Sequence, residues 1–436
     1  MTMKIFDPQS KVLIVGLGKS GLSSKRLLTE VFGFGPDQLK TFDESPAKTA
    51  DFQKPAEALG FDPDFVVLSP GYPRGNPWIQ SFLQHKSDRA LYSELDLAHS
   101  ALVEKTGAVS EKVIGITGSA GKSTTAAMLA RAIEVGGKKV FLGGNYGIPL
   151  ADYAYDVLTN RRERAEILVL ELSSYQLESL RLGVDIGVIT SFSRNHLDRY
   201  ASVEEYYEAK ASLWDRCSGA MILNPSSPDL VAWFTDEFYR DDRRLWWAGS
   251  RPWTGQRLLG KHNEQNLDLA AEVLDRLQMP PISYSTLMSF EGLPHRLENC
   301  GFRDGVLFVN DSKATTIDSV LVAVEAMRTA GMARMHLLLG GRDKDLPWED
   351  LAQLQKYPFI RAWFFGESAE RAQKASGLEG TRVATLREFF EKYRYEKQPG
   401  DVVLLSPGGS SLDQYKSFEE RGNEFKSLVN EYILNV

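Results

Sequence analysis

Short apolar runs alternate with amphipathic segments along almost the whole chain. The runs VLIV at 12–15, VVL at 66–68 and ILVL at 167–170 are each followed by polar or glycine-bearing residues. Continuous apolar runs of this length are typical of strands that are buried on both faces of a parallel sheet. The segment LSSKRLL at 22–28 has the pattern of a helix. This rhythm of strand, turn and helix predicts an α/β fold with parallel sheets.

Residues 113–125, VIGITGSAGKSTT, contain the most informative motif of the chain. An apolar strand pattern leads into a glycine-bounded loop, and a helix pattern follows. Such a loop offers backbone N–H groups and a helix N-terminus to an anion, while Lys122 adds a charge and a hydroxyl can hold Mg²⁺. The motif departs from G-x-x-x-x-G-K-[ST], because Ile116 stands where the first glycine is expected. The flanking strand and helix still favour nucleotide phosphate binding over an ordinary strand–turn–helix.

The predicted elements form three successive α/β units. The first covers 1–108 and has the rhythm of a small Rossmann-like domain. The polar stretch at 104–111 separates it from a central domain over 109–292, which contains the phosphate loop. The third unit, 293–436, repeats the theme, so we predict a second Rossmann-like domain there. At about 150 residues per domain, three domains also suit the length of the chain.

A second glycine turn, GLGKSG at 16–21, follows the first strand. Asp43 ends the next strand, about where a ribose-binding acid belongs in a dinucleotide site. A lone G-x-G-x-x-G is weak evidence, so three interpretations remain open: binding of a nicotinamide dinucleotide, binding of a different nucleotide-like ligand, and a plain tight turn. The pattern favours the second.

Polar residues follow the strands of the central unit. Glu171 ends the run ILVLE, where a carboxylate downstream of a phosphate loop often supplies a second Mg²⁺ contact; alternatively, it is a charge at a helix N-terminus. His196, next to Asp198 in NHLDRY, follows another strand pattern, which favours a metal or active-site role over a structural one. Lys210, judged by its pattern alone, is a lysine on the surface of a helix.

Further polar residues point to a site shared between the second and third units. Asn263 and Asn266, three residues apart, share a helix face and can hydrogen-bond a base or ribose, although Asn263 can equally cap the helix. Arg296 lies at the junction, where an arginine can move onto a phosphate. Several residues follow the strand patterns of the third unit, namely Asp311, Lys313, Thr315, Lys344 and Ser411.

Composition narrows the class of protein. The net charge of −7 argues against a protein whose main partner is nucleic acid. No secretory leader is visible, and no run reaches the roughly 18 apolar residues of a membrane span. Cys217 and Cys300 have no metal-type spacing, which fits a reduced, cytoplasmic setting.

Taken together, these motifs resemble the Mur ligase family, ATP-dependent amide-forming enzymes of peptidoglycan precursor synthesis. The resemblance covers nearly the whole chain, in family order, through the motifs GSAGKST, GGNYG, LELSSYQLES, NHLDRY, KHNEQN, LPHRLE, NDSKAT and SPGGSSLDQYKSFEERG. The last of these, with LELSSYQLES and GLGKSG, is most similar to the branch that adds D-glutamate. The resemblance implies that a monomer joins glutamate to UDP-N-acetylmuramoyl-L-alanine, using ATP and Mg²⁺ and an acyl-phosphate intermediate.

The resemblance also implies roles for individual residues. The uridine end of the substrate would lie against Lys19, Ser20, Asp43 and Gly71, and Asn145 would contact the same substrate. ATP would be bound by Gly118, Gly121, Lys122, Ser123, Thr124, Asn263, Asn266, Arg296 and Asp311. Mg²⁺ would be held by Ser123, Glu171, His196 and Lys210, the last as a carbamate, and the catalytic set would be Lys122, Glu171, His196 and Lys210. The incoming glutamate would be surrounded by Lys313, Thr315, Lys344, Ser411 and Phe418.

Three positions depart from the family pattern. Ala120 and Thr316 stand where asparagine is usual, and Glu44 follows Asp43 where some relatives have an arginine close by. Alternatives therefore stay open: a related ligase for L-glutamate or another amino acid, a nicotinamide-dependent oxidoreductase built on GLGKSG, and a non-catalytic ATP-gated binding protein. The oxidoreductase would leave the phosphate loop without a task. The non-catalytic binding protein would leave Lys210 without a catalytic task.

Overall fold

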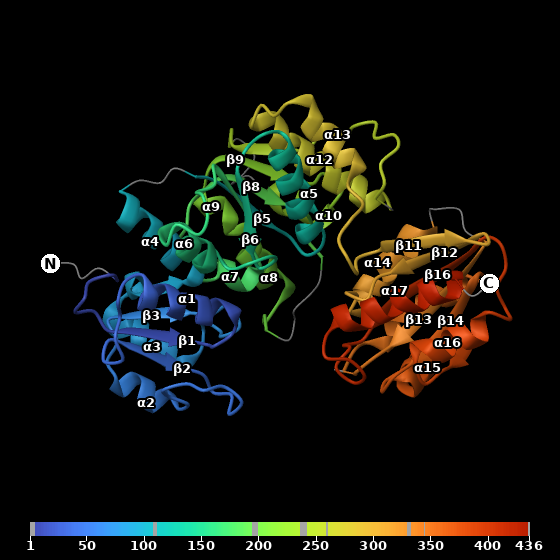
Figure 1. The fold of residues 1–436 in the computed structure, drawn as a ribbon, viewed down its shortest axis with the longest axis horizontal. Coiled ribbons are helices and arrows are strands. Elements are labelled where there is room, and N and C mark those ends of the chain that lie inside the picture. The colour runs from blue at the N-terminus through green and yellow to red at the C-terminus, as the bar shows by residue number, and fades with distance from the viewer. Residues whose placement is uncertain are drawn as a thin grey trace. The chain divides into compact units, whose positions relative to one another are not determined.

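The computed structural model of the chain describes residues 5–107, 111–193, 199–235, 242–258, 260–328, 333–343 and 345–434. Its strands form three sheets in chain order, named here sheets A, B and C and coloured blue, green and orange in Figure 1. The chain divides into two compact units. The first, Met1–Pro252 with Gln265–Leu287, contains sheets A and B, and the second, Trp253–Glu264 with Met288–Val436, contains sheet C.

Sheet A has four parallel strands in the order β2-β1-β3-β4. Its strands are β1 (Val12–Val15), β2 (Leu39–Phe42), β3 (Phe65–Leu68) and β4 (Leu91–Ser93). The helices are α1 (Lys19–Glu30), α2 (Pro55–Gly60), α3 (Pro77–Lys86), the short 3₁₀ helix η1 (Asp88–Ala90) and α4 (Glu94–Thr106). The strand order reverses between β1 and β3, and α/β sheets place ligands at the carboxyl ends of strands beside such a reversal.

Sheet B has six parallel strands in the order β10-β9-β8-β5-β7-β6, with β5 inside the sheet. The strands are β5 (Lys112–Thr117), β6 (Val140–Gly144), β7 (Ile167–Glu171), β8 (Val184–Ile189), β9 (Cys217–Leu223) and β10 (Leu245–Trp247). The helices are α5 (Lys122–Val135), α6 (Leu150–Leu158), α7 (Ser174–Leu177), α8 (Val203–Ala211), α9 (Leu213–Arg216), α10 (Pro228–Phe234), α12 (Lys261–Arg276) and α13 (Pro281–Ser289).

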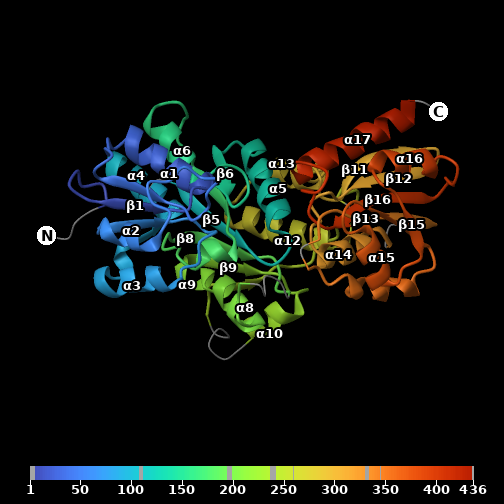
Figure 2. The same ribbon diagram turned by 90° about the horizontal axis from the view of Figure 1, so that it is seen from below.

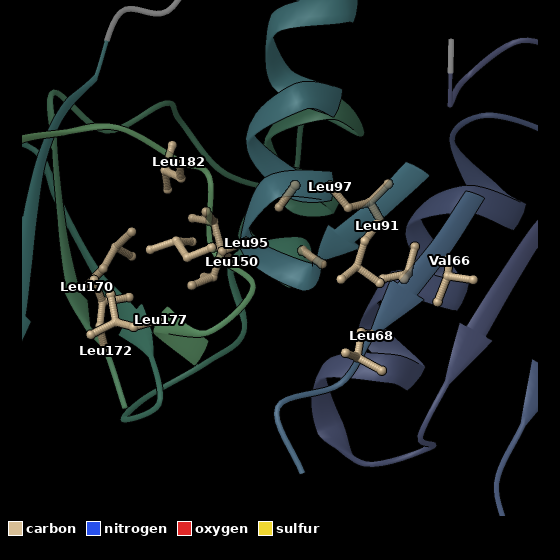
Figure 3. Close-up of a cluster of buried hydrophobic side chains, with 14 of the residues drawn as sticks. Val66, Leu68, Leu91, Leu95, Leu97, Leu150, Leu170, Leu172, Leu177 and Leu182 are labelled. Atoms are coloured by element: carbon tan, nitrogen blue, oxygen red, sulfur yellow. The ribbon is translucent and has the colours of Figure 1, made fainter. Parts of the chain in front are cut away.

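One continuous apolar core joins sheets A and B. Figure 3 shows it passing from Leu68 and Leu91 of sheet A through Leu95 of α4 to Leu150 of α6 and Leu170 of sheet B. Helices α1, α4 and α6 pack against one another beside sheet A (Figure 2). The two sheets therefore fold as parts of one body, although the sequence suggested a polar boundary between them.

Two buried carboxylates on the first turn of α4 reinforce this junction. Asp96 forms a capping box with Ser93 and also accepts hydrogen bonds from the backbone N–H groups of Arg181 and Leu182, at 2.9 and 2.7 Å. Glu94 accepts a hydrogen bond from the backbone N–H of Ala151, in the first turn of α6. Complete burial raises the pKa of Glu94 to about 8, because a low-dielectric environment disfavours the charged form.

Sheet C has the strand order β11-β12-β16-β13-β14-β15, and only β11 and β12 pair antiparallel. Its strands are β11 (Glu298–Arg303), β12 (Val306–Asn310), β13 (Arg334–Gly340), β14 (Ile360–Phe365), β15 (Gly380–Arg382) and β16 (Asp401–Gly408). Helices α14 (Ile317–Arg328), η2 (Trp348–Lys356) and α15 (Ala369–Ser376) share one apolar cluster with the sheet. Helices α16 (Leu386–Tyr393) and α17 (Phe418–Leu434) share a second.

The predicted α/β class is confirmed, with a sheet in each of the three predicted regions. The domain boundaries at 108 and 292 stay predictions. None of the helices in the described part of the chain combines the length and the hydropathy that a membrane span requires.

Candidate active site

The loop between β5 and α5 has a backbone that only glycine allows at two positions. Gly118 has a φ of +140°, and a Cβ there would lie 2.0 Å from Thr190 Oγ1. Gly121 has a φ of +86°, and a Cβ there would lie 2.5 Å from Asn266 Oδ1. Ile116 is a buried residue of β5 rather than part of the loop. The missing glycine of the longer motif is therefore not needed, because the turn begins at Gly118.

Lys122 and the first turn of α5 surround this loop with polar groups. Lys122 Nζ donates hydrogen bonds to the carbonyl oxygens of Gly118 and Ser119, at 2.8 and 3.2 Å. Ser123 is buried on the first turn of α5, and Thr124 beside it is half-buried. Ala120 has an exposed side chain, and its backbone N–H donates to Ser191 Oγ. Ser191, which follows β8, therefore holds the loop backbone at position 120, although the usual asparagine is absent there.

Glu171 ends β7 in direct register with β5 and is 1 % exposed. Its Oε1 accepts a hydrogen bond of 2.7 Å from Asn145 Nδ2, and the Asn145 backbone N–H donates to the Glu171 carbonyl oxygen. Its Oε2 is buried and has no hydrogen-bond partner among the described residues. A buried carboxylate oxygen in this state fits the preference of Mg²⁺ for oxygen ligands.

Lys210 on α8 is buried, 1 % exposed, with its Nζ 4.6 Å from the centre of the Tyr206 ring. Burial, and to a lesser extent the charge of Lys122, hold the pKa of Lys210 well below its ordinary value, while Glu171 acts in the opposite direction. The surface position that the helix pattern alone suggested is therefore wrong. Lys122, Glu171 and Lys210 share one electrostatic neighbourhood beside the phosphate loop.

The predicted metal ligands form an unusual set. Within the described ranges, no group of three or more His, Cys, Asp or Glu side chains is placed to hold a metal ion. The predicted set has one carboxylate, Glu171, with the hydroxyl of Ser123 and a lysine that needs modification before it can bind a metal. His196 lies outside the described residues.

Sheet A carries a separate cavity of about 410 Å³ at the carboxyl ends of β1, β2 and β3. Its lining contains all four residues predicted to bind the uridine end of a substrate, Lys19, Ser20, Asp43 and Gly71. The position beside the strand reversal is where an α/β sheet binds its ligand. The structure thus brings these four residues together in one pocket, here named the nucleotide pocket after its predicted ligand.

Two carboxylates shape the wall of the nucleotide pocket. Asp43 accepts hydrogen bonds from the backbone N–H groups of Leu17 and Ser45, at 2.7 and 3.0 Å, so it holds the glycine turn in place. Glu44 Oε1 accepts a hydrogen bond of 3.1 Å from the hydroxyl of Tyr72. Where some relatives have an arginine, this chain therefore presents an acidic wall.

In the second unit, Asp311 follows β12 and is buried. It accepts hydrogen bonds from the Leu297 backbone N–H and the Ser406 hydroxyl, at 3.2 and 3.0 Å, and burial raises its pKa to about 7. Arg296 lies between two residues in the left-handed region, His295 at φ +64° and Leu297 at φ +43°. Non-glycine residues rarely adopt this backbone, and they cluster at functional sites.

Four of the five residues predicted to surround the amino acid are described, and they follow strands β12 and β16 of sheet C. Lys313 Nζ lies 4.0 Å from the centre of the Phe418 ring, a cation–π contact. Ser411 is buried after β16, and Thr315 is half-buried after β12. Lys344 lies outside the described residues.

The two predicted adenosine residues on α12 fall in different units. Asn266 belongs to the first unit, against Gly121, and Asn263 belongs to the second. Both side chains are buried.

In the second unit, Thr316 Oγ1 accepts a hydrogen bond from the Ser319 backbone N–H and caps α14. Asparagine would cap the helix equally well, so this contact does not explain why threonine replaces it.

Arg421 on α17 is a residue that the sequence interpretation missed. It is fully buried and donates through Nε and Nη2 to Ser312 and through Nη1 to the Gly409 carbonyl oxygen. It thereby joins the loops after β12 and β16, and burial lowers its pKa to about 10. Its position on the same helix stripe as Phe418 and Phe425 was a usable signal, because an arginine rarely occupies an apolar stripe without a buried partner.

Two family models match the chain: the Mur ligase middle domain over residues 116–242, and the Mur ligase glutamate ligase domain over residues 295–409. The UDP-N-acetylmuramoylalanine–D-glutamate ligase of Symbiobacterium thermophilum is 32 % identical over 464 residues, covering 97 % of this chain and 98 % of that protein. The same-named ligase of Lawsonia intracellularis is 33 % identical, covering 98 % of this chain and 95 % of that protein.

The chain belongs to the Mur ligase family.

Solved Mur ligases share its fold. The UDP-N-acetylmuramate-alanine ligase of Thermotoga maritima aligns with a TM-score of 0.57 at 16 % identity, covering 98 % of this chain and 100 % of that chain. The MurF ligase of the same organism, solved in complex with ADP, aligns with a TM-score of 0.58 at 16 % identity, covering 84 % of this chain and 95 % of that chain. At this identity the likeness supports the Mur ligase fold alone.

Proposed function

We propose that this chain is an ATP-dependent ligase that joins D-glutamate to UDP-N-acetylmuramoyl-L-alanine in peptidoglycan precursor synthesis. Relatives with that name align over nearly the full length of both chains. One observation carries the proposal. Lys122, Glu171 and Lys210 lie close enough at the phosphate loop for their charges to interact, in the same compact unit as the nucleotide pocket.

In the proposed reaction, the phosphate loop positions ATP for attack by the terminal carboxylate of the sugar-nucleotide substrate. Backbone N–H groups of the loop, with Ser123 and Thr124 at the start of α5, receive the phosphates. Lys122 exchanges its hydrogen bonds to the loop carbonyls for contacts with phosphate oxygens, and its charge stabilises the transferring phosphoryl group. The product of this step is an acyl phosphate with ADP as leaving group.

Mg²⁺ fits beside this loop, where its charge would offset that of the phosphates. Glu171 Oε2 and the Ser123 hydroxyl are the proposed ligands, together with His196. Lys210 would complete the set as a carbamate: its neutral amine attacks CO₂, a C–N bond forms as one C=O π bond of CO₂ opens, and the amine proton passes to solvent. Burial favours the neutral amine that this reaction needs, and the product is an oxygen donor in place of an ammonium group.

The second step requires an amino acid held beside the acyl phosphate while water is kept away. In the proposed arrangement Lys313, Thr315, Lys344, Ser411 and Phe418 surround the incoming glutamate. Two lysines and a hydroxyl suit a dicarboxylic amino acid. The adenosine and phosphate parts of ATP are assigned to Asn263, Asn266, Arg296 and Asp311, and Asn145 to the sugar-nucleotide.

A phosphate-release assay tests the proposal. Purified protein receives UDP-N-acetylmuramoyl-L-alanine, ATP and Mg²⁺, and in parallel reactions D-glutamate, L-glutamate, L-alanine or diaminopimelate. We expect phosphate release that requires the sugar-nucleotide and is fastest with D-glutamate, accompanied by a new amide product in the mass spectrum. Release that ignores the amino acid, or a preference for another one, would contradict it.

The same preparation separates the competing functions. A nicotinamide-dependent oxidoreductase would bind NAD(H) and not ATP, and a non-catalytic ATP-gated protein would bind ATP without releasing phosphate. A cytoplasmic location and a monomeric state belong to the proposal as well; size-exclusion chromatography with light scattering checks the monomer.

A further inference from the structure

One arginine connects the nucleotide pocket to the strand edge that carries Glu171. Arg199 follows β8, and its Nη1 donates a hydrogen bond of 3.0 Å to the carbonyl oxygen of Pro70, which lines the pocket. Its Nη2 donates a hydrogen bond of 2.9 Å to Glu178 Oε2. Glu178 ends α7, the helix that begins three residues after Glu171. The Arg199 guanidinium thus spans from sheet A to sheet B, and it acts beside Arg74, whose Nη1 donates a hydrogen bond of 3.1 Å to the Glu178 carbonyl oxygen.

The guanidinium is held firmly in this position. It lies 4.0 Å from the centre of the Tyr175 ring, and the other oxygen of Glu178 accepts a hydrogen bond of 2.7 Å from the Tyr200 hydroxyl. The side chains of Arg199 and Glu178 are only 14 and 20 % exposed. The planar guanidinium of arginine can stack on a ring and donate hydrogen bonds in two directions at once. The ammonium group of lysine cannot reproduce this arrangement.

The contact is one of several links between the two sheets. The continuous core through α4 and α6 already joins them, and so do the buried carboxylates Glu94 and Asp96. A second arginine makes a similar bridge at the other end of the sheets: Arg181 donates to the Arg89 carbonyl oxygen and lies 4.4 Å from the Tyr92 ring. Arg181 precedes β8, on the side away from the phosphate loop.

We infer that Arg199 is a positioning residue that fixes the spacing between the nucleotide pocket and the phosphate-transfer centre. This rests on the proposed function, in which one substrate has its uridine end in the pocket and its reacting carboxylate at the phosphate loop. Such a substrate is bound at two places whose separation must match its length. Reacting atoms must come within about 3–3.5 Å, and a misplacement of about 1 Å can cost about 10²-fold in rate. Arg199 sets that separation through Pro70 and Glu178.

The test compares Arg199→Met and Arg199→Lys with the matched control Arg181→Met. Methionine keeps the apolar stem in each case and removes the guanidinium. Kinetic constants for UDP-N-acetylmuramoyl-L-alanine and for ATP are measured, together with the melting temperature and the Kd of UDP alone. UDP carries the uridine end of the proposed substrate and lacks its reacting carboxylate, so its affinity reports on the pocket and not on the spacing.

We expect both Arg199 variants to lower kcat/KM for the sugar-nucleotide by about 10–100-fold. In the same variants the KM for ATP and the Kd of UDP stay within about threefold of the unmodified chain. Arg181→Met should leave all these constants within about twofold. Rescue by Arg199→Lys, equal losses in Arg199→Met and Arg181→Met, or parallel loss of UDP binding would overturn the inference.

The unmodified chain serves as the reference that separates the two proposals. If it releases no phosphate with the sugar-nucleotide, ATP and D-glutamate, the proposed function fails and the inference fails with it. If it turns over normally and Arg199→Met does the same, the inference alone fails. A fall of the melting temperature by more than about 5 °C in Arg199→Met but not in Arg181→Met would assign Arg199 a purely structural role.

Discussion

The chain contains two strand–turn–helix units with nearly the same turn sequence and different construction. Gly18-Lys19-Ser20 leads from β1 into α1, and Gly121-Lys122-Ser123 leads from β5 into α5. In both units the lysine is the first residue of its helix. By motif alone both turns look like anion sites, because each presents a helix N-terminus preceded by glycine.

What faces each turn is different. In the first, the carboxylate of Asp43 accepts a hydrogen bond from the Leu17 backbone N–H, so one donor of the turn is already occupied. In the second, Lys122 extends over its own loop, with Lys210 and Glu171 buried in the same neighbourhood. The glycine motif gives a turn its shape, and the side chains from neighbouring strands decide what the turn binds.

Exchange of the two lysines for alanine gives the largest expected difference between the turns. Lys122→Ala should lower kcat by about 10³-fold, because a charge directed at the transferring phosphoryl group is lost. Lys19→Ala removes an exposed lysine and should change kcat by less than about threefold. Steady-state phosphate release measures both. Similar losses of kcat in the two variants would mean that both lysines act on the transferring phosphoryl group.

Lys210→Ala tests what the buried lysine adds to the second turn. Loss of a metal ligand should lower kcat by about 10²–10³-fold. Added short carboxylates such as formate or acetate should restore part of the activity, since they can supply the missing oxygen donor, whereas short amines should not. An intact mass that lacks the CO₂ adduct, together with absence of any rescue, would contradict the carbamate.

Substitution of the glycine before each lysine should give a smaller difference between the two turns, measured as kcat/KM for ATP. Gly121→Ala forces a Cβ to within 2.5 Å of Asn266 Oδ1 at a φ of +86°, so we expect the loop to move and kcat/KM for ATP to fall. The fall should be about 10–100-fold. Gly18 has an ordinary φ of −75° and no atom within 4 Å of a built Cβ, so Gly18→Ala should leave ATP kinetics unchanged. Equal ATP constants in both variants would contradict the contrast.

The smallest expected effect concerns the junction between the turns rather than the turns themselves. Burial raises the pKa of Glu94 from its ordinary 4.5 to about 8, so in this range of pH the folded chain keeps a proton that the unfolded chain loses. Its stabilising contribution is therefore complete below pH 4.5 and is lost as the pH rises to 8, by at most about 1.4 kcal/mol per pH unit.

Glu94→Gln should remove that dependence while keeping an acceptor for the Ala151 backbone N–H. The free energy of unfolding, measured in urea from pH 5 to 9, should therefore rise in the variant relative to the unmodified chain as the pH increases to 8. The difference should level off above pH 8. Two curves that stay parallel over this range would show that Glu94 is ionised in the folded state.

Much of the site could be predicted from the sequence. Its residues follow the carboxyl ends of strands, and its phosphate loop needs a backbone conformation that favours glycine. The carboxyl ends of parallel strands meet at one edge of a sheet, so Glu171 and Asp43 could be placed near ligands from their position in the chain. Gly118 and Gly121 were informative because their backbone geometry excludes other residues.

The remaining features depend on packing between distant segments. The helix pattern around Lys210 did not predict burial, and only the family resemblance pointed to that lysine. Nothing local indicates that Asn145 pairs with Glu171, or that Arg199 connects Pro70 with Glu178. The polar stretch after α4 predicts a domain boundary, and it could not reveal that the apolar core continues through α4 into sheet B.

That core has a consequence for the order in which the chain acquires structure during synthesis. The ribosome completes β1 to β4 and α4 before it has made α6, which packs against α1 and α4. Until residue 158 has emerged, α4 has only α1 as a neighbouring helix, Leu95 lacks the cover of α6, and Glu94 has no partner at Ala151. Sheet A should therefore become resistant to protease only after α6 leaves the exit tunnel, and a chain truncated at residue 107 should need a chaperone to remain in solution.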